Sequence, residues 1–320
     1  MKLISIVTPC YNEEANIAEL IRRVREVMAS LPEYAYEHVF VDNSSEDRTL
    51  EILKGFAADD RRVKIIVNAR NFGHIRSHYY ALLQARGDAV VSLVADLQDP
   101  PEMIRDFVKK WEQGFKVVVG IKTRSRESWW MYRLRGLYYK MIKSMASVEL
   151  LEQFTGFGLY DRRVMDVLRG LREPYPYFRG LISDIGFSMA RIEYTQPARR
   201  MGKTKNNFFT LFDMAMLGFT NYTRVPLRLA TLLGFFAAGC SLVVGMAYLV
   251  AKLIFWNIFT AGMAPVVIGN FFLGSVQLLF LGIVGEYVAT MLTYVQNRPL
   301  VVEKERINFN EPPGNQTINN

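Results

Sequence analysis

Residues 89–101 read AVVSLVADLQDPP, and this stretch decides the fold. It begins as a run of small and β-branched residues, which is typical of a buried strand, and it ends abruptly in Asp96, Gln98 and Asp99 before two prolines. In an open α/β sheet, ligands bind at the carboxyl ends of the strands. A carboxylate and an amide two residues apart at such an end suit a hard divalent cation that also holds phosphate oxygens. A simple turn is the alternative, because Asp and Pro are common turn residues.

The same arrangement recurs through the first part of the chain. Short apolar runs rich in β-branched residues predict strands, and apolar residues at helical spacing between them predict amphipathic helices. Strands that alternate with helices indicate an α/β fold, a mostly parallel sheet with helices on both faces. The expected strands are residues 3–8, 39–41, 63–67, the opening stretch and 116–121; the expected helices are residues 17–31, one from about 48, 75–84 and 101–111.

Polar residues follow the first four of these strands. The carboxyl ends of parallel strands meet at one edge of a sheet, so we expect these side chains to lie together there. That edge is the default site for a nucleotide. The residues concerned are Tyr11, Asn12, Glu13, Asp42, Arg70, Asn71, Asp96 and Gln98.

Composition divides the chain in two. Half of the 320 residues are hydrophobic, and the excess collects after Arg228. The formal net charge of +8 favours anionic partners such as nucleotides or phospholipids; no nucleic-acid motif accompanies it, and no nucleic-acid partner is expected. The apolar run at the N-terminus is too short for a signal peptide. Cys10 and Cys240 form neither a disulfide framework nor a metal-ligand pattern.

The C-terminal part predicts a membrane anchor. Residues 208–222 are amphipathic and aromatic, which favours a helix in the membrane plane. Two apolar runs, 229–255 and 266–292, each exceed the ~20 residues that span a bilayer. Lys and Arg flank the pair, so both flanks are expected in the cytoplasm. The predicted organisation is a catalytic domain at 1–205, an interfacial helix at 206–226, two transmembrane helices at 227–295 and a cytoplasmic tail at 296–320.

Several segments leave two interpretations open. The basic loop 199–205 (RRMGKTK) suits a diphosphate, but it also suits solvent or anionic lipid. Aromatic and basic residues in the helix expected at 129–145 suit either a membrane surface or packing on the sheet. Residues 155–158 (TGFG) are expected to form a flexible turn. His74 and His78 are spaced like a zinc pair, but Ile75 stands where that motif has glutamate.

Taken together, five motifs resemble those of family 2 glycosyltransferases, and more closely the polyisoprenyl-phosphate sugar transferases. They are TPCYNEE (8–14), VDNSSEDRT (41–49), RNFG (70–73), ADLQDPP (95–101) and residues 200–205. The resemblance covers nearly the whole chain. It implies a GT-A fold, a UDP- or GDP-sugar donor with UDP favoured, Mg²⁺ or Mn²⁺, inversion at the anomeric carbon, and a polyprenyl (undecaprenyl) phosphate acceptor. The protein would then be a multi-pass protein of the inner membrane with its catalytic domain in the cytoplasm, and a homo-oligomer is expected.

The resemblance also implies roles by position. Pro9, Tyr11, Glu13 and Asp42 would hold the nucleoside with Arg70 nearby, Asp96 and Gln98 would hold the metal, and Arg200 and Lys205 would close over the phosphates. Two positions depart from the family pattern, because Val94 and Gly156 each stand where relatives carry aspartate. A phosphate monoester acceptor has a second pKa of about 6, so it is already a nucleophilic anion at neutral pH and needs no general base.

Two other functions fit parts of the chain. A catalytically degenerate subunit that binds the lipid carrier is favoured by Val94 and Gly156, and opposed by Asp96, Gln98 and the basic loop. A processive polysaccharide synthase of the same superfamily would be expected to carry a Gln-x-x-Arg-Trp motif and more membrane helices, which this sequence does not contain.

Overall fold

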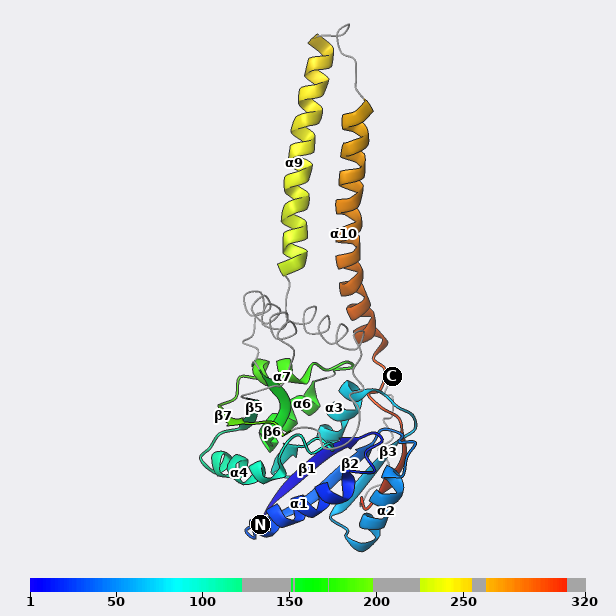
Figure 1. The fold of residues 1–320 in the computed structure, drawn as a ribbon. Helices are drawn as coiled ribbons and strands as arrows, with labels where there is room; N and C mark the ends of the chain where they lie inside the picture. The colour runs from blue at the N-terminus through cyan, green and yellow to red at the C-terminus, as the bar shows by residue number, and fades with distance from the viewer. Residues whose placement is uncertain (123–150, 152, 172, 198–224, 255–262, 310–320) are drawn as a thin grey trace.

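The computed structural model describes residues 1–122, 151, 153–171, 173–197, 225–254 and 263–309. These residues form an α/β domain from which two long helices project (Figure 1). Four sequence predictions lie wholly or mainly outside the described residues: the helix at 129–145, the basic loop with Arg200 and Lys205, the interfacial helix, and the loop between the apolar runs.

An eight-stranded mixed sheet in the order β7-β5-β6-β4-β1-β2-β3-β8 is the centre of the domain. Pairing is parallel between β1 and β2, β1 and β4, β2 and β3, and β5 and β7, and antiparallel elsewhere. A mixed, mostly parallel sheet was predicted, and it is confirmed. The strands are β1 (Lys2–Cys10), β2 (Tyr34–Asp42), β3 (Val63–Asn68), β4 (Ala89–Ser92), β5 (Val117–Lys122), β6 (Phe154–Asp161), β7 (Met189–Tyr194) and β8 (Glu303–Ile307).

Helices cover both faces of this sheet, as the sequence pattern predicted. One buried cluster joins β1 side chains such as Ile4 to α1, α2 and α4, and the other joins residues such as Val7 to α3, α6 and α7. Successive side chains of a strand point to opposite faces, which is why neighbouring β1 residues belong to different clusters. The helices are α1 (Ile17–Ala29), α2 (Thr49–Asp59), α3 (His74–Gln84), the 3₁₀ turn η1 (Pro101–Met103), α4 (Ile104–Glu112), α6 (Arg162–Gly170) and α7 (Phe178–Asp184).

Strand β6 corrects the prediction that residues 155–158 form a flexible turn. The strand lies between β4 and β5 and is antiparallel to both. A Cβ atom at Gly158 would lie 2.4 Å from the carbonyl oxygen of Val118. This glycine is therefore required because two strands approach closely, and the motif that resembles a turn belongs to the interior of the sheet.

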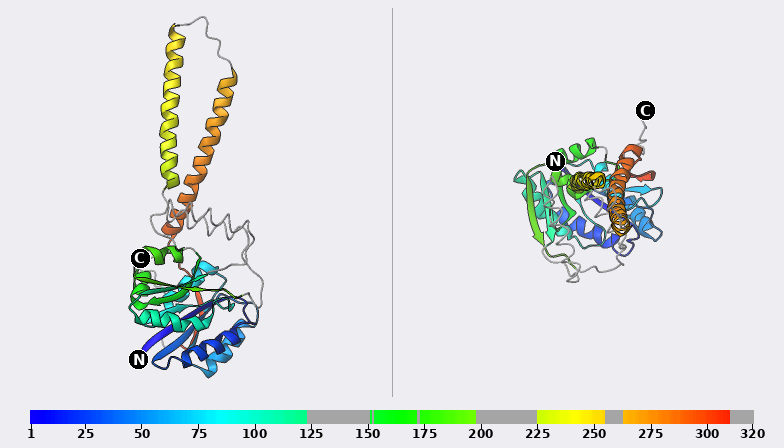
Figure 2. Two further views of the ribbon diagram at one scale, coloured as in Figure 1. Left: turned by 60° about the vertical axis from the view of Figure 1, so that its left-hand side comes forward. Right: turned by 90° about the horizontal axis from the view of Figure 1, so that it is seen from above.

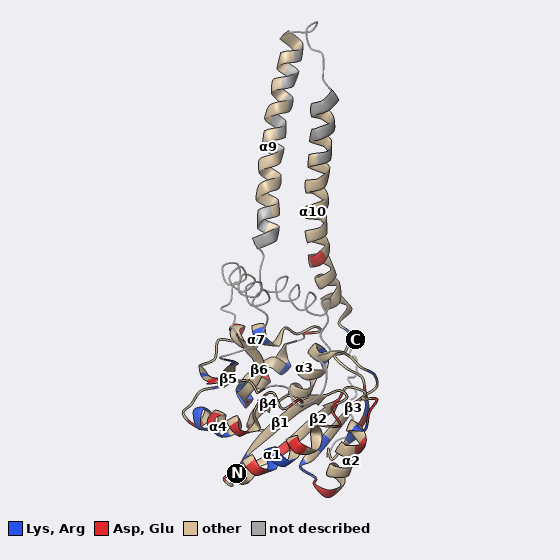
Figure 3. Cartoon of the chain, in the orientation of Figure 1, with Lys and Arg blue, Asp and Glu red and all other residues tan. Residues whose placement is uncertain are grey.

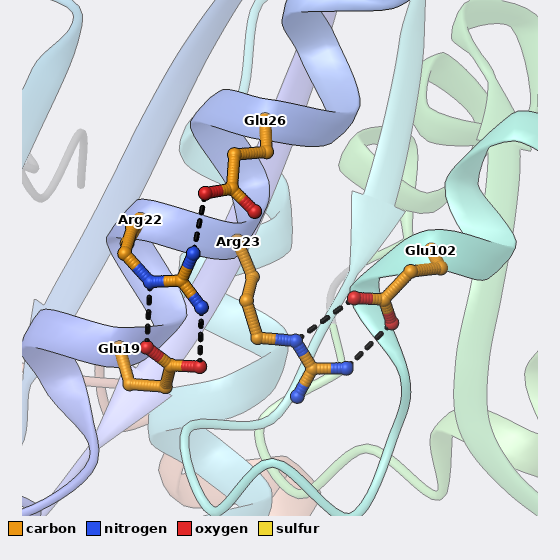
Figure 4. Close-up of polar contacts among 5 residues, drawn as sticks. All are labelled: Glu19, Arg22, Arg23, Glu26 and Glu102. Carbon is orange, nitrogen blue, oxygen red and sulfur yellow. Dashed lines mark hydrogen bonds and ion pairs between the residues drawn. The ribbon is translucent and has the colours of Figure 1, made fainter.

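An ion pair fixes the end of the loop that follows β4. The guanidinium of Arg23 on α1 donates to both carboxylate oxygens of Glu102, over 2.9 and 2.5 Å (Figure 4). Glu102 lies in η1, directly after the two prolines, so the contact ties this loop to α1. On the same helix Arg22 pairs with Glu19 and Glu26, but these pairs are exposed and contribute little to stability.

The two long helices are α9 (Val225–Ile254) and α10 (Met263–Gln296). They stand over the α/β domain (Figure 2), and the charge-coloured view shows one acidic turn on α10, which the sequence identifies as Glu286 (Figure 3). Residues 272–296 form a helix long and apolar enough to cross a membrane, with mean hydropathy 1.7 and none of it buried. The sequence predicted two such spans, but among the described residues only this helix meets the criterion.

The segment after α10 was predicted to be a tail, but part of it is a strand of the sheet. Residues Glu303–Ile307 form β8, which pairs antiparallel with β3 at the edge of the sheet. The alternation of charged residues in EKERI hid this strand, because its side chains are only partly buried. The chain therefore returns from α10 to the α/β domain.

Replacing Gly158 tests the packing of β6. We expect Gly158→Ala to lower the free energy of unfolding by about 3 kcal/mol or more, because neither backbone can move away. Gly55→Ala in α2 is the matched control: a Cβ there meets nothing within 4 Å, and alanine in a helix should raise stability by about 1 kcal/mol. Thermal unfolding of the full chain in detergent measures both, and equal stability of the two variants would contradict the assignment.

His38 predicts a loss of stability in acid. Its ring is buried in β2, lies 3.0 Å from the Thr8 hydroxyl and stacks 4.0 Å from Phe40; burial, with a smaller contribution from Arg25, lowers its pKa from 6.5 to about 3. Below pH 6.5 the unfolded chain binds a proton at His38, whereas the folded chain does not. The free energy of unfolding should therefore fall by up to about 2 kcal/mol as the pH is lowered from 7 to 5. The melting temperature of His38→Gln should depend less on pH than that of the wild type. An unchanged dependence would refute the role of His38 in the loss of stability in acid.

Candidate active site

Three strained residues mark one edge of the sheet. Asn12, Ser44 and Leu97 have φ angles of 55°, 63° and 59° and follow β1, β2 and β4. Left-handed backbone is unfavourable for residues other than glycine, and most of all for a bulky one such as Leu97. Strain of this kind persists where the surrounding structure fixes a functional geometry. The carboxyl ends of these strands are therefore the candidate site.

The loops after β1 and β2 brace each other. The backbone N–H of Asn12 donates to the Ser45 hydroxyl over 3.0 Å, and the Asn12 side chain accepts from the N–H of Glu46 over 2.8 Å. The N–H of Glu13 donates to the Thr49 hydroxyl over 2.7 Å. These bonds hold both loops without any ligand, and they place Tyr11 and Glu13 half-buried beside the end of β2.

Asp42 is the most deeply buried of the predicted site residues. It is 0% exposed, and its Oδ2 accepts from the N–H of Ser45 over 3.1 Å. Its Oδ1 is buried without a hydrogen-bond partner in the described part of the chain. Burial raises its pKa, and the charge of Asp47 raises it further. A buried acceptor without a partner is unfavourable by about 1–3 kcal/mol, so this oxygen is suited to an N–H or O–H group of a ligand.

Cys10 lies near the carboxylate of Asp42, and its thiol is not a nucleophile. Burial raises the pKa of its thiol well above the usual value, and the negative charges of Asp42, Glu13 and Asp47 raise it further. The thiol stays protonated at neutral pH, and nucleophilic attack requires the thiolate. Cys10 pairs with Asp42 across β1 and β2, Glu13 lies in the loop that is bonded to Thr49 after β2, and half-buried Pro9 precedes Cys10 in β1. Four predicted donor residues, Pro9, Tyr11, Glu13 and Asp42, therefore gather at one place.

An asparagine network holds the loop after β3. The Asn43 amide donates to Asn71 over 2.8 Å, and its oxygen accepts from Asn68 and from the N–H of Phe72, both over 3.0 Å. Asn71 also accepts from the N–H of Gly73 over 2.8 Å. Sequence analysis assigned no such role to Asn43 or Asn68; their position at strand ends was the only signal. The network positions α3 relative to β2.

Arg70 contacts a different set of residues from the other predicted donor ligands. It is exposed, donates to the carbonyl oxygen of Asn71 over 3.0 Å, and lies 4.1 Å from the centre of the Phe72 ring. None of its described contacts is to Asp42 or Asp96. The described contacts therefore do not connect Arg70 to the group formed by Pro9, Tyr11, Glu13 and Asp42.

Asp96 and Gln98 lie in the loop after β4 and are joined by a hydrogen bond. This strand ends at Ser92, earlier than the sequence predicted, and the loop continues with alternating burial in which Val94, Asp96 and Gln98 are half-buried. Asp96 Oδ1 accepts from the N–H of Gln98 over 3.1 Å.

Asp99 was left out of the predicted site, and the structure places it there. It is buried, and Oδ1 accepts from the Tyr194 hydroxyl of β7 over 2.6 Å. Burial raises its pKa to about 6; the Tyr194 bond and Lys122 lower it, whereas Asp96 raises it. The alternation along residues 94–99 was a signal that could have revealed it as the inward-facing carboxyl of the loop.

A second group lies beside the same loop on α3, β4 and β6. His78 is buried, 2.8 Å from the Ser92 hydroxyl, and a Cβ at Gly156 would be 3.4 Å from its ring. Burial lowers the pKa of His78 to about 3, so the ring is neutral. Arg179 of α7 and Asp96 both act electrostatically on His74. Arg179 belongs to no motif, so its place beside the site could not be predicted from the sequence.

Comparison with known proteins gives the family. Residues 5–169 match the model of glycosyl transferase family 2. The chain belongs to this family. A glycosyltransferase of Bacillus subtilis (strain 168) is 36% identical over 93% of this chain and 92% of its own length. A prophage-derived bactoprenol glucosyl transferase of Shigella flexneri is 32% identical over 94% of this chain and 97% of its own. The protein is thus a family 2 glycosyltransferase related along its whole length to bactoprenol glucosyl transferases.

Among solved structures, glucosyl-3-phosphoglycerate synthase from Mycobacterium tuberculosis in complex with Mn²⁺, UDP and phosphoglyceric acid is similar. It is 19% identical with a TM-score of 0.45, and the match covers 73% of this chain and 78% of that chain. The α/β domain of this family 2 enzyme has the mixed, mostly parallel sheet that the sequence pattern predicted.

The residues present fit a divalent cation that a substrate helps to bind. In the described chain, no group of three His, Cys, Asp or Glu side chains is placed to hold a metal ion alone. Mg²⁺ is commonly bound by one or two carboxylates together with substrate phosphates and water. Asp96 and Gln98 offer a half-buried carboxylate and a half-buried amide oxygen in one loop, which suits such a shared site.

Asp96 should be indispensable for turnover. We expect Asp96→Asn to lower the transfer rate at least about a hundredfold, because several kcal/mol of charge stabilisation is lost. The side chain is half-buried and asparagine can still accept from Gln98, so the melting temperature should change little. Asp106→Asn on the exposed face of α4 is the matched control and should behave as wild type. A normal rate in Asp96→Asn, with the cation still required, would exclude this residue as a metal ligand.

Proposed function

We propose that this glycosyltransferase moves a sugar, with inversion, from a nucleotide sugar to polyprenyl phosphate at the cytoplasmic face of a membrane. The observation that carries the proposal is similarity to bactoprenol glucosyl transferases over more than nine-tenths of both chains, C-terminal helices included. A UDP-sugar is the favoured donor. The half of the site around Asp42 supports a nucleotide, since a nucleobase N–H would satisfy the unpartnered Oδ1.

The residues divide the chemistry between them. Pro9, Tyr11, Glu13 and Asp42 bind the nucleoside, with Arg70 at the rim. Asp96 and Gln98 orient the diphosphate, and the chemistry that a bound Mg²⁺ or Mn²⁺ supplies there is neutralisation of the leaving group. Arg200 and Lys205 close over the phosphates of donor or acceptor. The acceptor phosphate is already an anion, so alignment and charge neutralisation are what the protein must supply.

Membrane attachment is the second half of the proposal. The helix at 272–296 supports one span, and α9 is proposed as the second, with the interfacial helix at 206–226 beside it. The catalytic domain, residues 1–205 completed by β8, and the end of the chain would then share the cytoplasmic side. The expected homo-oligomer is part of this proposal, and the exposed Glu286 is its proposed contact.

Sealed vesicles of both orientations test reaction and topology together. Nucleotide sugars do not cross bilayers, so labelled sugar should reach undecaprenyl phosphate only in vesicles whose cytoplasmic face is outward, and only with Mg²⁺ or Mn²⁺ present. A panel of UDP- and GDP-sugars, with lipid products read by mass spectrometry, identifies the donor. Failure of every donor to label the lipid in detergent-opened vesicles would refute the acceptor, and transfer in the opposite orientation alone would refute the topology.

A further inference from the structure

Three arginines converge where α10 returns to the α/β domain. Arg70 belongs to the loop after β3, Arg76 to the first turn of α3, and Arg298 follows the end of α10 by two residues. A guanidinium nitrogen of Arg76 donates to the carbonyl oxygen of Pro299, which neighbours Arg298. The ring of Phe72 lies 4.1 Å from the Arg70 guanidinium and 5.5 Å from that of Arg76. We call these three residues the arginine cluster.

The positive charge of the arginine cluster is not compensated within the described residues. None of the ion pairs found there involves Arg70, Arg76 or Arg298. Burial and the charge of Arg70 lower the pKa of Arg76, Tyr175 raises it, and the charge of Arg298 lowers it by the smallest amount. The Nε atom of Arg76 is buried and lacks a described hydrogen-bond partner. Like charges held together at a partly buried place are unfavourable unless an anion joins them.

The location of the cluster indicates which anion. The helix that can cross a membrane ends at Gln296, so Arg298 would lie at the level of lipid headgroups. Helix α3 begins at His74 with neither an acidic residue in its first turn nor a side-chain cap, and its N-terminal end adds partial positive charge. Asp96 acts electrostatically on other groups, namely His74 and Asp99. The cluster therefore lies beside the candidate site, with Arg70 at the rim of both, and Arg298 would place its other end at the level of the bilayer surface.

We propose that the arginine cluster binds the phosphate of an anionic phospholipid headgroup at the membrane surface. Arginine forms paired hydrogen bonds to phosphate, and each basic residue near an anionic bilayer contributes about 1 kcal/mol. A bound headgroup would neutralise the cluster and hold α3, the loop after β3 and the end of α10 in one arrangement. This inference rests on the proposed membrane anchoring by α10.

Lipid retention by the purified full-length protein tests the site. Native mass spectrometry with equal phosphatidylglycerol and phosphatidylcholine should show preferential retention of phosphatidylglycerol. Arg298→Gln and Arg76→Gln should each weaken that preference about fivefold. Arg105→Gln is the matched control, because Arg105 lies on α4 and bonds to Ser30. Arg76 also contacts Pro299 and its loss can disturb the docking of α10, so exposed Arg298, whose side chain has no described hydrogen bond, provides the independent variant.

Three results would overturn the proposal. The first is equal retention of phosphatidylglycerol and phosphatidylcholine by the wild-type protein. The second is an unchanged preference for phosphatidylglycerol in both Arg298→Gln and Arg76→Gln. Displacement of phosphatidylglycerol by undecaprenyl phosphate, one for one, would assign the cluster to the acceptor. Sugar transfer and carbonate extraction are measured on the same preparations: loss of wild-type transfer or of membrane integration refutes the proposed function, whereas a fully active, integrated protein without lipid preference refutes only the arginine cluster.

Discussion

Burial of β1 on both faces is the constraint on which the rest of the structure depends. Its neighbours β2 and β4 are both parallel to it, and Cys10 pairs with Asp42 in register, so their carboxyl ends lie side by side. Helices cover both faces, and unpaired polar side chains cannot be accommodated along such strands without a large desolvation penalty. The polar residues that chemistry requires therefore follow the strand ends, where the chain also has to turn through left-handed residues.

The site combines satisfied and unsatisfied polar groups, and the difference is informative. Asn43 uses both ends of its amide to join Asn68, Asn71 and Phe72, which makes the loop after β3 rigid. Asp42, next to it in sequence, keeps one buried oxygen without a described partner. Because a network of satisfied bonds holds the surrounding loops, the structure tolerates this unfavourable group, and a ligand that donates to it recovers the energy. Rigid support beside an unsatisfied acceptor is the arrangement that selective binding requires.

The sequence predicted the elements whose signals are local. Strands β1 to β4 have apolar β-branched runs, and α1 has an apolar stripe, so their places were predicted to within a few residues. Strand β6 was missed because Gly156 and Gly158 resemble a turn; their purpose is close contact with His78 and Val118, which only the tertiary structure reveals. Strand β8 was missed because an edge strand needs no apolar run. Likewise, Arg179 and the Asp99–Tyr194 bond join segments far apart in sequence, so no motif could predict them.

Strand β8 makes the position of the catalytic domain depend on α10. Six residues separate the end of the helix from the start of β8, and β8 is bonded to β3. Arg306 donates to Glu303 over 2.5 Å and to Gln84 of α3 over 2.6 Å, and Asn308 donates to the carbonyl oxygens of Ala57 and Val63. These contacts hold β8 to α3, to the end of α2 and to β3, and β3 carries Asn68 of the Asn43 network. A displacement of α10 would thus be transmitted to the loop after β3 at the edge of the site, because rigid packed elements lie between them. The end of the chain therefore ties the loop after β3, at the edge of the candidate site, to the end of α10.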